Sequence, residues 1–208
     1  MRAAVLLGAV LVLGAAGPPR PVPPAPSPPL TPAMAPAAPA AAPARDGVVA
    51  YHLAPAGGEA FDVVVLFRAG GKALRMELPD KSYMLATPAT RSLALVVPSA
   101  RTATTLPWEE GPQPLFLIDT RMKFVKRAAS TIAGQRCTQW EAVREPGHNM
   151  LCVTEDGLVL RNQFQDAQGR HSLVEAFAVK YDAMVGADFD VPAGFDRLDA
   201  GLQPAPAR

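Results

Sequence analysis

The chain has 208 residues, with 20 basic and 19 acidic side chains. Its first 45 residues carry three Arg and no acid, and Arg208 lies in the C-terminal tail, so residues 46–199 hold 16 basic against 19 acidic side chains. The resulting net charge of −3 argues against a basic nucleic-acid-binding surface. No apolar stretch reaches the roughly 18 residues that a membrane-spanning helix needs, and the length beyond residue 45 suits one domain.

The N-terminus has the pattern of an export signal. Met1-Arg2 is basic, the stretch Ala3–Ala16 is apolar, and small residues at its end predict cleavage after Ala16. An uncleaved anchor or a buried helix is the alternative. No Cys follows the apolar run, so a lipoprotein of the usual kind is not expected. We therefore expect export to a bacterial periplasm.

Residues 17–45 are predicted to form a disordered linker. Pro18–Arg45 contains 12 Pro and nine Ala among its 28 residues, and proline removes backbone donors that helices and sheets require. A polyproline-II-like spacer is expected, which a broad-specificity protease should trim to near Arg45. The folded domain is placed at residues 46–199, and residues 200–208 are expected to be a flexible tail.

From Asp46 onward, apolar and polar residues alternate with turn residues every eight to twelve positions, which is typical of antiparallel sheets. Each of the first five strands should pair with the one before it. The predicted strands are Val48–Leu53, Phe61–Arg68, Lys72–Leu78, Ser82–Thr87 and Arg91–Val97.

The segment Ser99–Thr120 breaks this rhythm with three prolines. It offers a short helix from Pro114 to about Arg121, although a strand restarting at Met122–Arg127 is equally compatible with the sequence. A segment this irregular inside a compact domain is often a lid or a covering loop. The alternative is surface packing without a role.

The last third of the domain sets a strand register. Asp156-Gly157 is a two-residue hairpin signal that places Thr154 opposite Val159 and Cys152 opposite Arg161. The following turn, centred on Gln168, places Arg161 opposite Glu175 and Val159 opposite Phe177. The core face is then expected to carry Leu151, Val153, Leu158, Leu160, Phe164 and Val174, with Trp140 from the preceding strand.

Four runs in this part resemble small exported bacterial proteins of the LolA/LolB lipoprotein-carrier superfamily. They are Thr131–Trp140 (TIAGQRCTQW), Cys152–Arg161 (CVTEDGLVLR), Glu175–Tyr181 and Pro192–Phe195. The resemblance implies a mainly β fold: an unclosed, curved antiparallel half-barrel with a short helix or loop over its concave face, which can hold lipid. It brings no catalytic residues. The chain departs from the carriers in lacking an amphipathic helix before its first strand.

A disulfide between Cys137 and Cys152 is expected, because two Cys in one exported domain usually pair; two buried free thiols are the alternative. The bridge requires a wide loop over Ala142–Gly147, with Trp140 opposite Asn149. Arg161 and Glu175 are expected to pair beside the disulfide, away from the core. The alternative for these two is a polar clamp for a ligand head group.

No catalytic or metal-binding pattern is present. The three His (His52, His148 and His171) fall in separate segments, with His148 expected in a turn, and Cys137 and Cys152 are not spaced as Cys-x-x-Cys. We expect no enzyme, cofactor or metal. The main hypothesis is an envelope protein that binds a lipid or a lipoprotein acyl chain without transforming it. The alternatives are a structural or interaction module with a closed core and, third, a hydrolase.

The expected ligand face consists of the inward-facing apolar residues of at least six strands, which are Phe61, Val63, Val65, Phe67, Leu74, Met76, Leu93, Leu95, Trp140, Val153 and Leu160. Large exposed apolar patches are uncommon on soluble monomers, so this face must meet a loop, a partner or a ligand. Complete filling by Ser99–Thr120 would leave a closed core instead.

Overall fold

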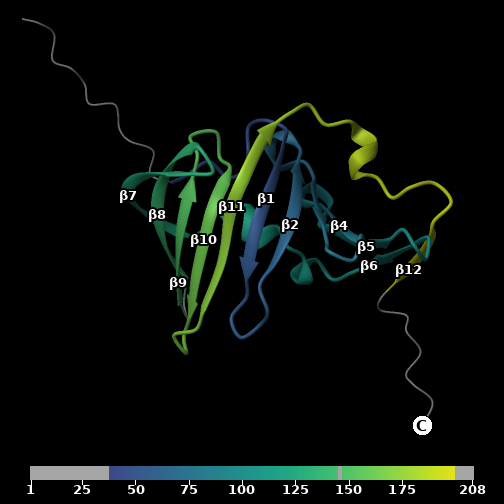
Figure 1. Cartoon of the computed structure of the whole chain (residues 1–208), viewed down its shortest axis with the longest axis horizontal. Helices are drawn as coiled ribbons and strands as arrows, with labels where there is room; N and C mark the ends of the chain where they lie inside the picture. Colours follow the sequence, from purple (N-terminus) through teal and green to yellow (C-terminus); the bar gives the residue numbers. More distant parts are fainter. Residues whose placement is uncertain (1–37, 145–146, 200–208) are drawn as a thin grey trace, which may run out of the picture. The chain divides into compact units, whose positions relative to one another are not determined.

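A computed structural model describes residues 38–144 and 147–199 of the chain. These residues form one antiparallel sheet of twelve strands with a parallel pair at one end, in the order β12-β6-β5-β4-β3-β2-β1-β11-β10-β9-β8-β7. The end strands β12 and β7 do not pair with each other, so the sheet is not closed (Figure 1). The predicted fold class, a mainly β unclosed sheet, is confirmed. The predicted signal peptide and the tail 200–208 lie outside the described residues.

The strands of the first half form the predicted meander, each pairing with the one before. Their bounds are Gly47–Ala54 (β1), Phe61–Phe67 (β2), Leu74–Glu77 (β3), Tyr83–Thr87 (β4), Ser92–Val97 (β5) and Thr102–Thr105 (β6). The sequence pattern did not predict β6, which lies inside the irregular segment. A short strand, β12 (Asp196–Asp199), pairs with it in parallel.

The second half contributes four long strands and β11, which joins the two halves by pairing with β1. Their bounds are Lys123–Ile132 (β7), Gln135–Arg144 (β8), Gly147–Val153 (β9), Val159–Asp166 (β10) and His171–Tyr181 (β11). His148 therefore lies in β9 and not in the turn where the sequence analysis placed it.

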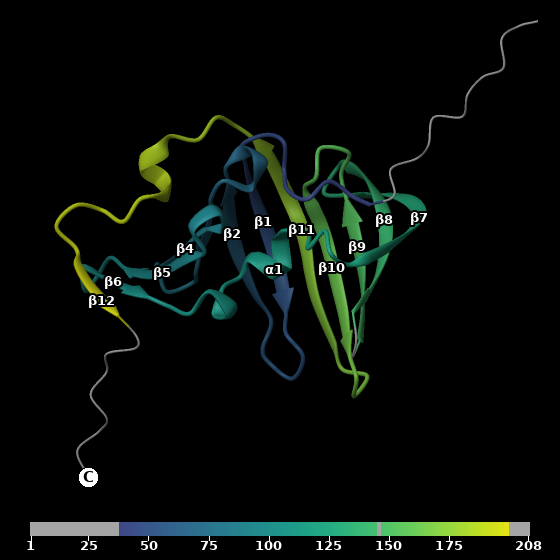
Figure 2. The same ribbon diagram turned by 180° about the vertical axis from the view of Figure 1, so that it is seen from behind.

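One face of the sheet, here called the inner face, packs against the only α-helix in the described residues, α1 (Gln113–Phe116). The Phe116 ring is fully buried between Tyr51 and Phe67, with ring centroids 4.9 and 6.2 Å away. In Figure 2, α1 lies in front of β1, β11 and β10. Short 3-10 turns occur at Ala69–Gly71 (η1), Pro88–Thr90 (η2), Trp108–Glu110 (η3) and Gly186–Phe189 (η4).

The helix is shorter than the sequence pattern predicts, because it ends at Phe116 and not near Arg121. Leu117 is extended, and the Ile118 amide donates to the Ala41 carbonyl at 2.9 Å instead of continuing the helix. Leu115, Ile118 and Met122 would share one face of a longer helix, but no such face forms because the helix ends before Ile118.

The hairpin between β9 and β10 differs from the predicted two-residue turn. The Thr154 amide donates to the Leu158 carbonyl, which makes a three-residue loop, and Val159 faces Val153 in place of Thr154. A bulge at Leu160 then restores the predicted alignment of Arg161 with Cys152. Because of this bulge, Val159 belongs to the inner-face core.

A buried phenol stabilises the bulge. The Tyr51 hydroxyl donates to the Val159 carbonyl at 2.7 Å, and the small Ala176 lies opposite Tyr51 on the intervening strand β11. Burial raises the pKa of Tyr51 well above its ordinary value, so this hydroxyl stays a donor. The second predicted turn is confirmed, since Arg161 faces Glu175.

The predicted start of the domain at residue 46 is too late. Residues 38–45, here called the strap, pack on the domain: Pro39 and Pro43 are buried, and the strap exchanges backbone hydrogen bonds with Ile118, Gly70 and Asp156. Proline prevents a segment from joining a helix or a sheet, but it does not prevent the segment from packing against a folded domain. The prediction of disorder is therefore wrong for these eight residues. The other residues of the linker, 17–37, lie outside the described part of the chain.

Candidate functional site

A groove of about 420 Å³ lies between the inner face of β7–β10 and the segment that crosses it. We call this segment, residues 108–122, the cover; it contains η3, α1 and the loop that leads to β7. Leu151 and Val159 line the groove on the sheet side, and Leu115, Leu117 and Met122 line it from the cover. A volume of this size falls within the range of about 300–1,000 Å³ that is typical of small-molecule sites.

Phe124 also lines the groove and rests edge-on against the Trp140 ring, with centroids 6.4 Å apart. Phe124 and Met122 are only half-buried although each packs against the apolar cluster of Ile118, Trp140 and Leu151. This part of the lining is therefore apolar and incompletely covered, while Gln113, Asn149 and Asn162 add polar groups to the groove.

Two asparagines fasten the cover to the sheet. The Asn162 amide nitrogen donates to the Leu115 carbonyl at 3.2 Å, and its oxygen accepts from the Asn149 amide nitrogen at 3.2 Å. The Asn149 oxygen is buried and accepts no hydrogen bond in the described structure. Buried polar groups of this kind hold a segment in one arrangement, because breaking their bonds leaves them unpaired.

The charged residues at the rim of the groove pair with one another. Arg91 contacts Glu109 at 2.7 Å, and Arg121 contacts Asp119 at 2.7 Å. The hydrogen bond and the charge of Asp119 raise the pKa of Arg121. The rim thus offers balanced charges on both sides of an apolar lining.

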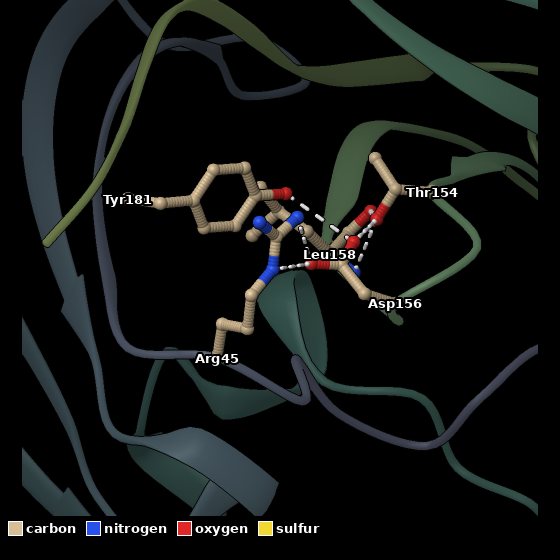
Figure 3. A network of polar contacts seen from close by, with 5 residues as sticks. All are labelled: Arg45, Thr154, Asp156, Leu158 and Tyr181. Carbon is tan, nitrogen blue, oxygen red and sulfur yellow. Dashed lines mark hydrogen bonds and ion pairs between the residues drawn. The ribbon is translucent and has the colours of Figure 1, made fainter.

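A second polar group lies at the end of the sheet where the strap meets the β9–β10 turn (Figure 3). The Asp156 carboxylate accepts from Arg45 Nε at 2.9 Å and from the Tyr181 hydroxyl at 3.2 Å. Burial by itself raises the pKa of Asp156, but hydrogen bonds from Thr154, Arg45 and Tyr181 hold it below its ordinary value of 3.8. The Arg45 guanidinium also stacks 3.7 Å from the centre of the Tyr181 ring.

Most of the expected ligand face is filled and not open. Nine of its eleven residues are buried, seven of them (Val63, Val65, Phe67, Leu74, Met76, Leu93 and Leu160) in the cluster that contains Phe116. Trp140 and Val153 lie in the cluster next to the groove, and Leu160 forms the bulge. Phe61 is 37% exposed and Leu95 is half-buried. None of the eleven lines the groove directly.

The sequence pattern did not predict Asn149, Asn162 or Phe116 as site residues. Asn162 was detectable, because the predicted register already places it on the core face between Leu160 and Phe164, where a polar side chain needs a partner. Phe116 was missed because it lies in the segment whose conformation the pattern left open.

Cys137 and Cys152 form the predicted disulfide, with Cα atoms 5.5 Å apart. The predicted wide loop is wrong: Arg144 pairs with Gly147 and Trp140 with Leu151, so the turn is tight and the bridge joins diagonal neighbours. Beside it, Arg161 Nε contacts Glu175 Oε2 at 2.6 Å. Arg161 and Glu175 each alternate along their strand with residues of the inner face. Their side chains therefore lie on the outer face of the sheet and outside the groove.

In the described part of the chain, no group of three or more His, Cys, Asp and Glu side chains is placed to hold a metal. His52 contacts Asp62 at an exposed position, and His148 and His171 are exposed in other strands. No helix in residues 38–144 and 147–199 is both long and apolar enough to span a membrane.

No protein-family model matches this chain, and no curated protein does. Solved structures share its fold. An uncharacterized conserved protein from Thermus thermophilus superposes with a TM-score of 0.54 and 10% identity, over 75% of this chain and 91% of that one. MucB superposes with a TM-score of 0.54 and 9% identity over 76% of this chain, which spans 61% of MucB. A LolA superfamily protein from Nitrosomonas europaea is also similar, with a TM-score of 0.42, 11% identity and coverage of 73% and 92%.

Proposed function

We propose that this domain is a non-enzymatic binding module of the cell envelope that receives an acyl chain in the groove beneath the cover. The observation that carries the proposal is the apolar lining: Leu151, Phe124 and Met122 face a space that the described chain leaves unfilled. Burying apolar surface contributes about 25 cal/mol per Å², so an acyl chain gains affinity here without any charged partner.

The rim supports this ligand class. Because Arg91 and Arg121 are each paired with a neighbouring carboxylate, the groove lacks the excess of one sign that would attract a highly charged ligand. Half-buried Met122 and Phe124 have side chains that adapt to a flexible chain.

The disulfide supports placement of the domain outside the cytosol, since disulfides persist in oxidising compartments. Together with the export signal expected at the N-terminus, it favours a bacterial periplasm. Neither a cofactor nor a metal is part of the proposal.

The second candidate is an interaction module that binds a protein through its outer face. Val64 on β2 is 38% exposed, and Phe177, the extra residue where β11 bulges against β1, is 56% exposed. These apolar side chains are not covered by the described residues, and a protein partner could bury them.

The test is displacement of a fluorescent acyl probe from the delipidated full chain. Phe67 is unsuitable for substitution, because a charge there would disrupt the core around Phe116. The Met122→Glu variant places an unpaired carboxylate in the groove lining and should weaken binding at least about tenfold. The matched control is Val125→Glu, which adds the same charge at a position 45% exposed, three residues away and outside the groove lining.

Val125→Glu should bind as the unmodified chain does. An equal loss of probe affinity in both variants would show that the added charge weakens binding wherever it is placed, and that the groove is not the binding site. Absence of saturable binding by the unmodified chain at micromolar concentrations would defeat the acyl-chain proposal and favour the interaction module.

A further inference from the structure

The strap contacts three separate parts of the domain over a short length of chain. Its Pro43 carbonyl accepts from the Gly70 amide at 2.6 Å in η1, and its Ala44 amide donates to the Asp156 carbonyl at 2.7 Å in the β9–β10 turn. The Ala41 carbonyl accepts from the Ile118 amide at 2.9 Å in the cover. In Figure 2 the purple segment before β1 crosses the end of the sheet that holds the β9–β10 turn.

Two glycines make room for the strap. A Cβ at Gly71 would lie 2.8 Å from the Ala42 Cβ, and a Cβ at Gly157 would lie 2.3 Å from the Ala42 carbonyl oxygen. Both approaches are closer than real Cβ contacts allow. The strap is therefore fitted against the domain on two sides, at η1 and at the hairpin.

The strap is held at one end by charge. Arg45, which is 59% exposed, pairs with Asp156 and stacks on Tyr181, while Thr154 donates a further hydrogen bond to the same carboxylate. The cover is bonded to the strap at Ile118, to the sheet at Asn162 and to Arg91 through Glu109, so the strap provides one of its polar attachments.

We propose that the strap is a latch for the cover: while Arg45 and Asp156 hold it in place, the Ala41–Ile118 bond keeps the cover closed over the groove. This inference rests on the proposed function, in that the groove is what the latch closes. Release of the strap weakens the hold on Ile118, and the cover then opens more often for an entering acyl chain. The population that is open to entry rises, and the association rate of the acyl chain rises with it.

The test compares two glycine variants in the full chain. Gly71→Ala wedges a methyl group against Ala42, whereas Gly57→Ala, in the loop between β1 and β2, has no atom within 4 Å of its added Cβ. Both residues have a positive φ, at 66° and 77°, so the two variants carry similar backbone strain and differ in contact with the strap. Arg45→Ala is a third variant, which removes the ion pair at an exposed position without backbone strain.

Two quantities are measured in each variant: hydrogen exchange of the Ile118 amide, and the association rate of the fluorescent acyl probe. Loss of one hydrogen bond of ordinary strength corresponds to roughly a fivefold change in an opening equilibrium. Gly71→Ala and Arg45→Ala should speed both Ile118 exchange and probe association about fivefold relative to Gly57→Ala and the unmodified chain.

Equal exchange at Ile118 in all four proteins would overturn the latch. Faster exchange with unchanged probe association would also overturn it, because the cover would then not limit entry. If the unmodified chain binds no probe, the proposed function fails, and the exchange of Ile118 alone decides whether the strap holds the cover.

Discussion

Asp156 is the residue on which three features of this domain depend. Within the β9–β10 turn, the Asp156 carboxylate accepts a hydrogen bond from the Thr154 hydroxyl. The same carboxylate accepts hydrogen bonds from Arg45 of the strap and from the Tyr181 hydroxyl of β11. A single ionised side chain thus joins segments that are more than 100 residues apart in sequence, and its charge state should influence stability.

Asp156 should make the domain sensitive to acid. Its folded-state pKa is held below the ordinary value of 3.8, so the unfolded chain binds more protons in this range. The stabilisation is present above the ordinary value and is lost as pH falls through the lowered folded value. Urea unfolding of Asp156→Asn and the unmodified chain should differ most at neutral pH and converge on acidification. A stability difference independent of pH between neutrality and pH 3 would contradict this assignment.

The disulfide should contribute on the order of 3 kcal/mol, since it closes a loop between residues 15 apart and limits the unfolded chain. Reduction should therefore lower the urea midpoint of the unmodified chain. The control is a double Cys137→Ala, Cys152→Ala variant, whose midpoint should not respond to reductant. An unchanged midpoint of the unmodified chain after verified reduction would refute the estimate.

At the scale of elements, the cover shows how little regular structure is needed to fill one half of the inner face. α1 has only four residues, yet it inserts Phe116 between Tyr51 and Phe67. The chain then leaves the helical conformation at Leu117, which allows Ile118 to bond to the strap. The packing of Phe116 and the hydrogen bond from Ile118 to the strap therefore stabilise this conformation over the longer helix that the spacing of apolar residues predicts.

Phe116→Ala should lower the free energy of unfolding by about 3–5 kcal/mol, because it empties a fully buried ring position. Phe177→Ala removes the same ring from a position that is 56% exposed and should change stability by less than about 0.5 kcal/mol. Both values follow from urea unfolding. Similar losses in the two variants would show that α1 does not close the core.

The sequence predicts the strands correctly where the alternation of apolar and polar residues and the positions of turn residues indicate the same strand pairing. It predicted the meander of β1–β5 and the alignment of Arg161 with Glu175, because period-two patterns fix which residues share a face. It could not predict the bulge at Leu160, since Asp156-Gly157 fits both a two-residue and a three-residue turn and the Tyr51 bond to Val159 is long-range. It also missed the docked strap, because the composition of a proline-rich tract does not reveal a fitted surface elsewhere.

At the scale of the whole described unit, the two halves of the inner face differ. The half formed by β1–β5 is closed by Phe116 and a continuous buried cluster, whereas the half formed by β7–β10 keeps a groove beside the cover. The outer face of β4–β6 is closed separately: Val191 and Phe195 pack on the cluster of Tyr83, Leu85 and Val96. On the inner face of the described unit, the groove is therefore where apolar side chains such as Met122 and Phe124 stay incompletely covered.

Native mass spectrometry of the purified full chain, combined with lipid extraction, tests whether the groove holds an acyl chain. If it does, one amphiphile per chain should co-purify with the unmodified protein and with Val125→Glu, and it should be lost in Met122→Glu. A protein that carries no amphiphile in any of the three forms, or one that retains it equally in Met122→Glu, would contradict the assignment of the groove as an acyl-chain site.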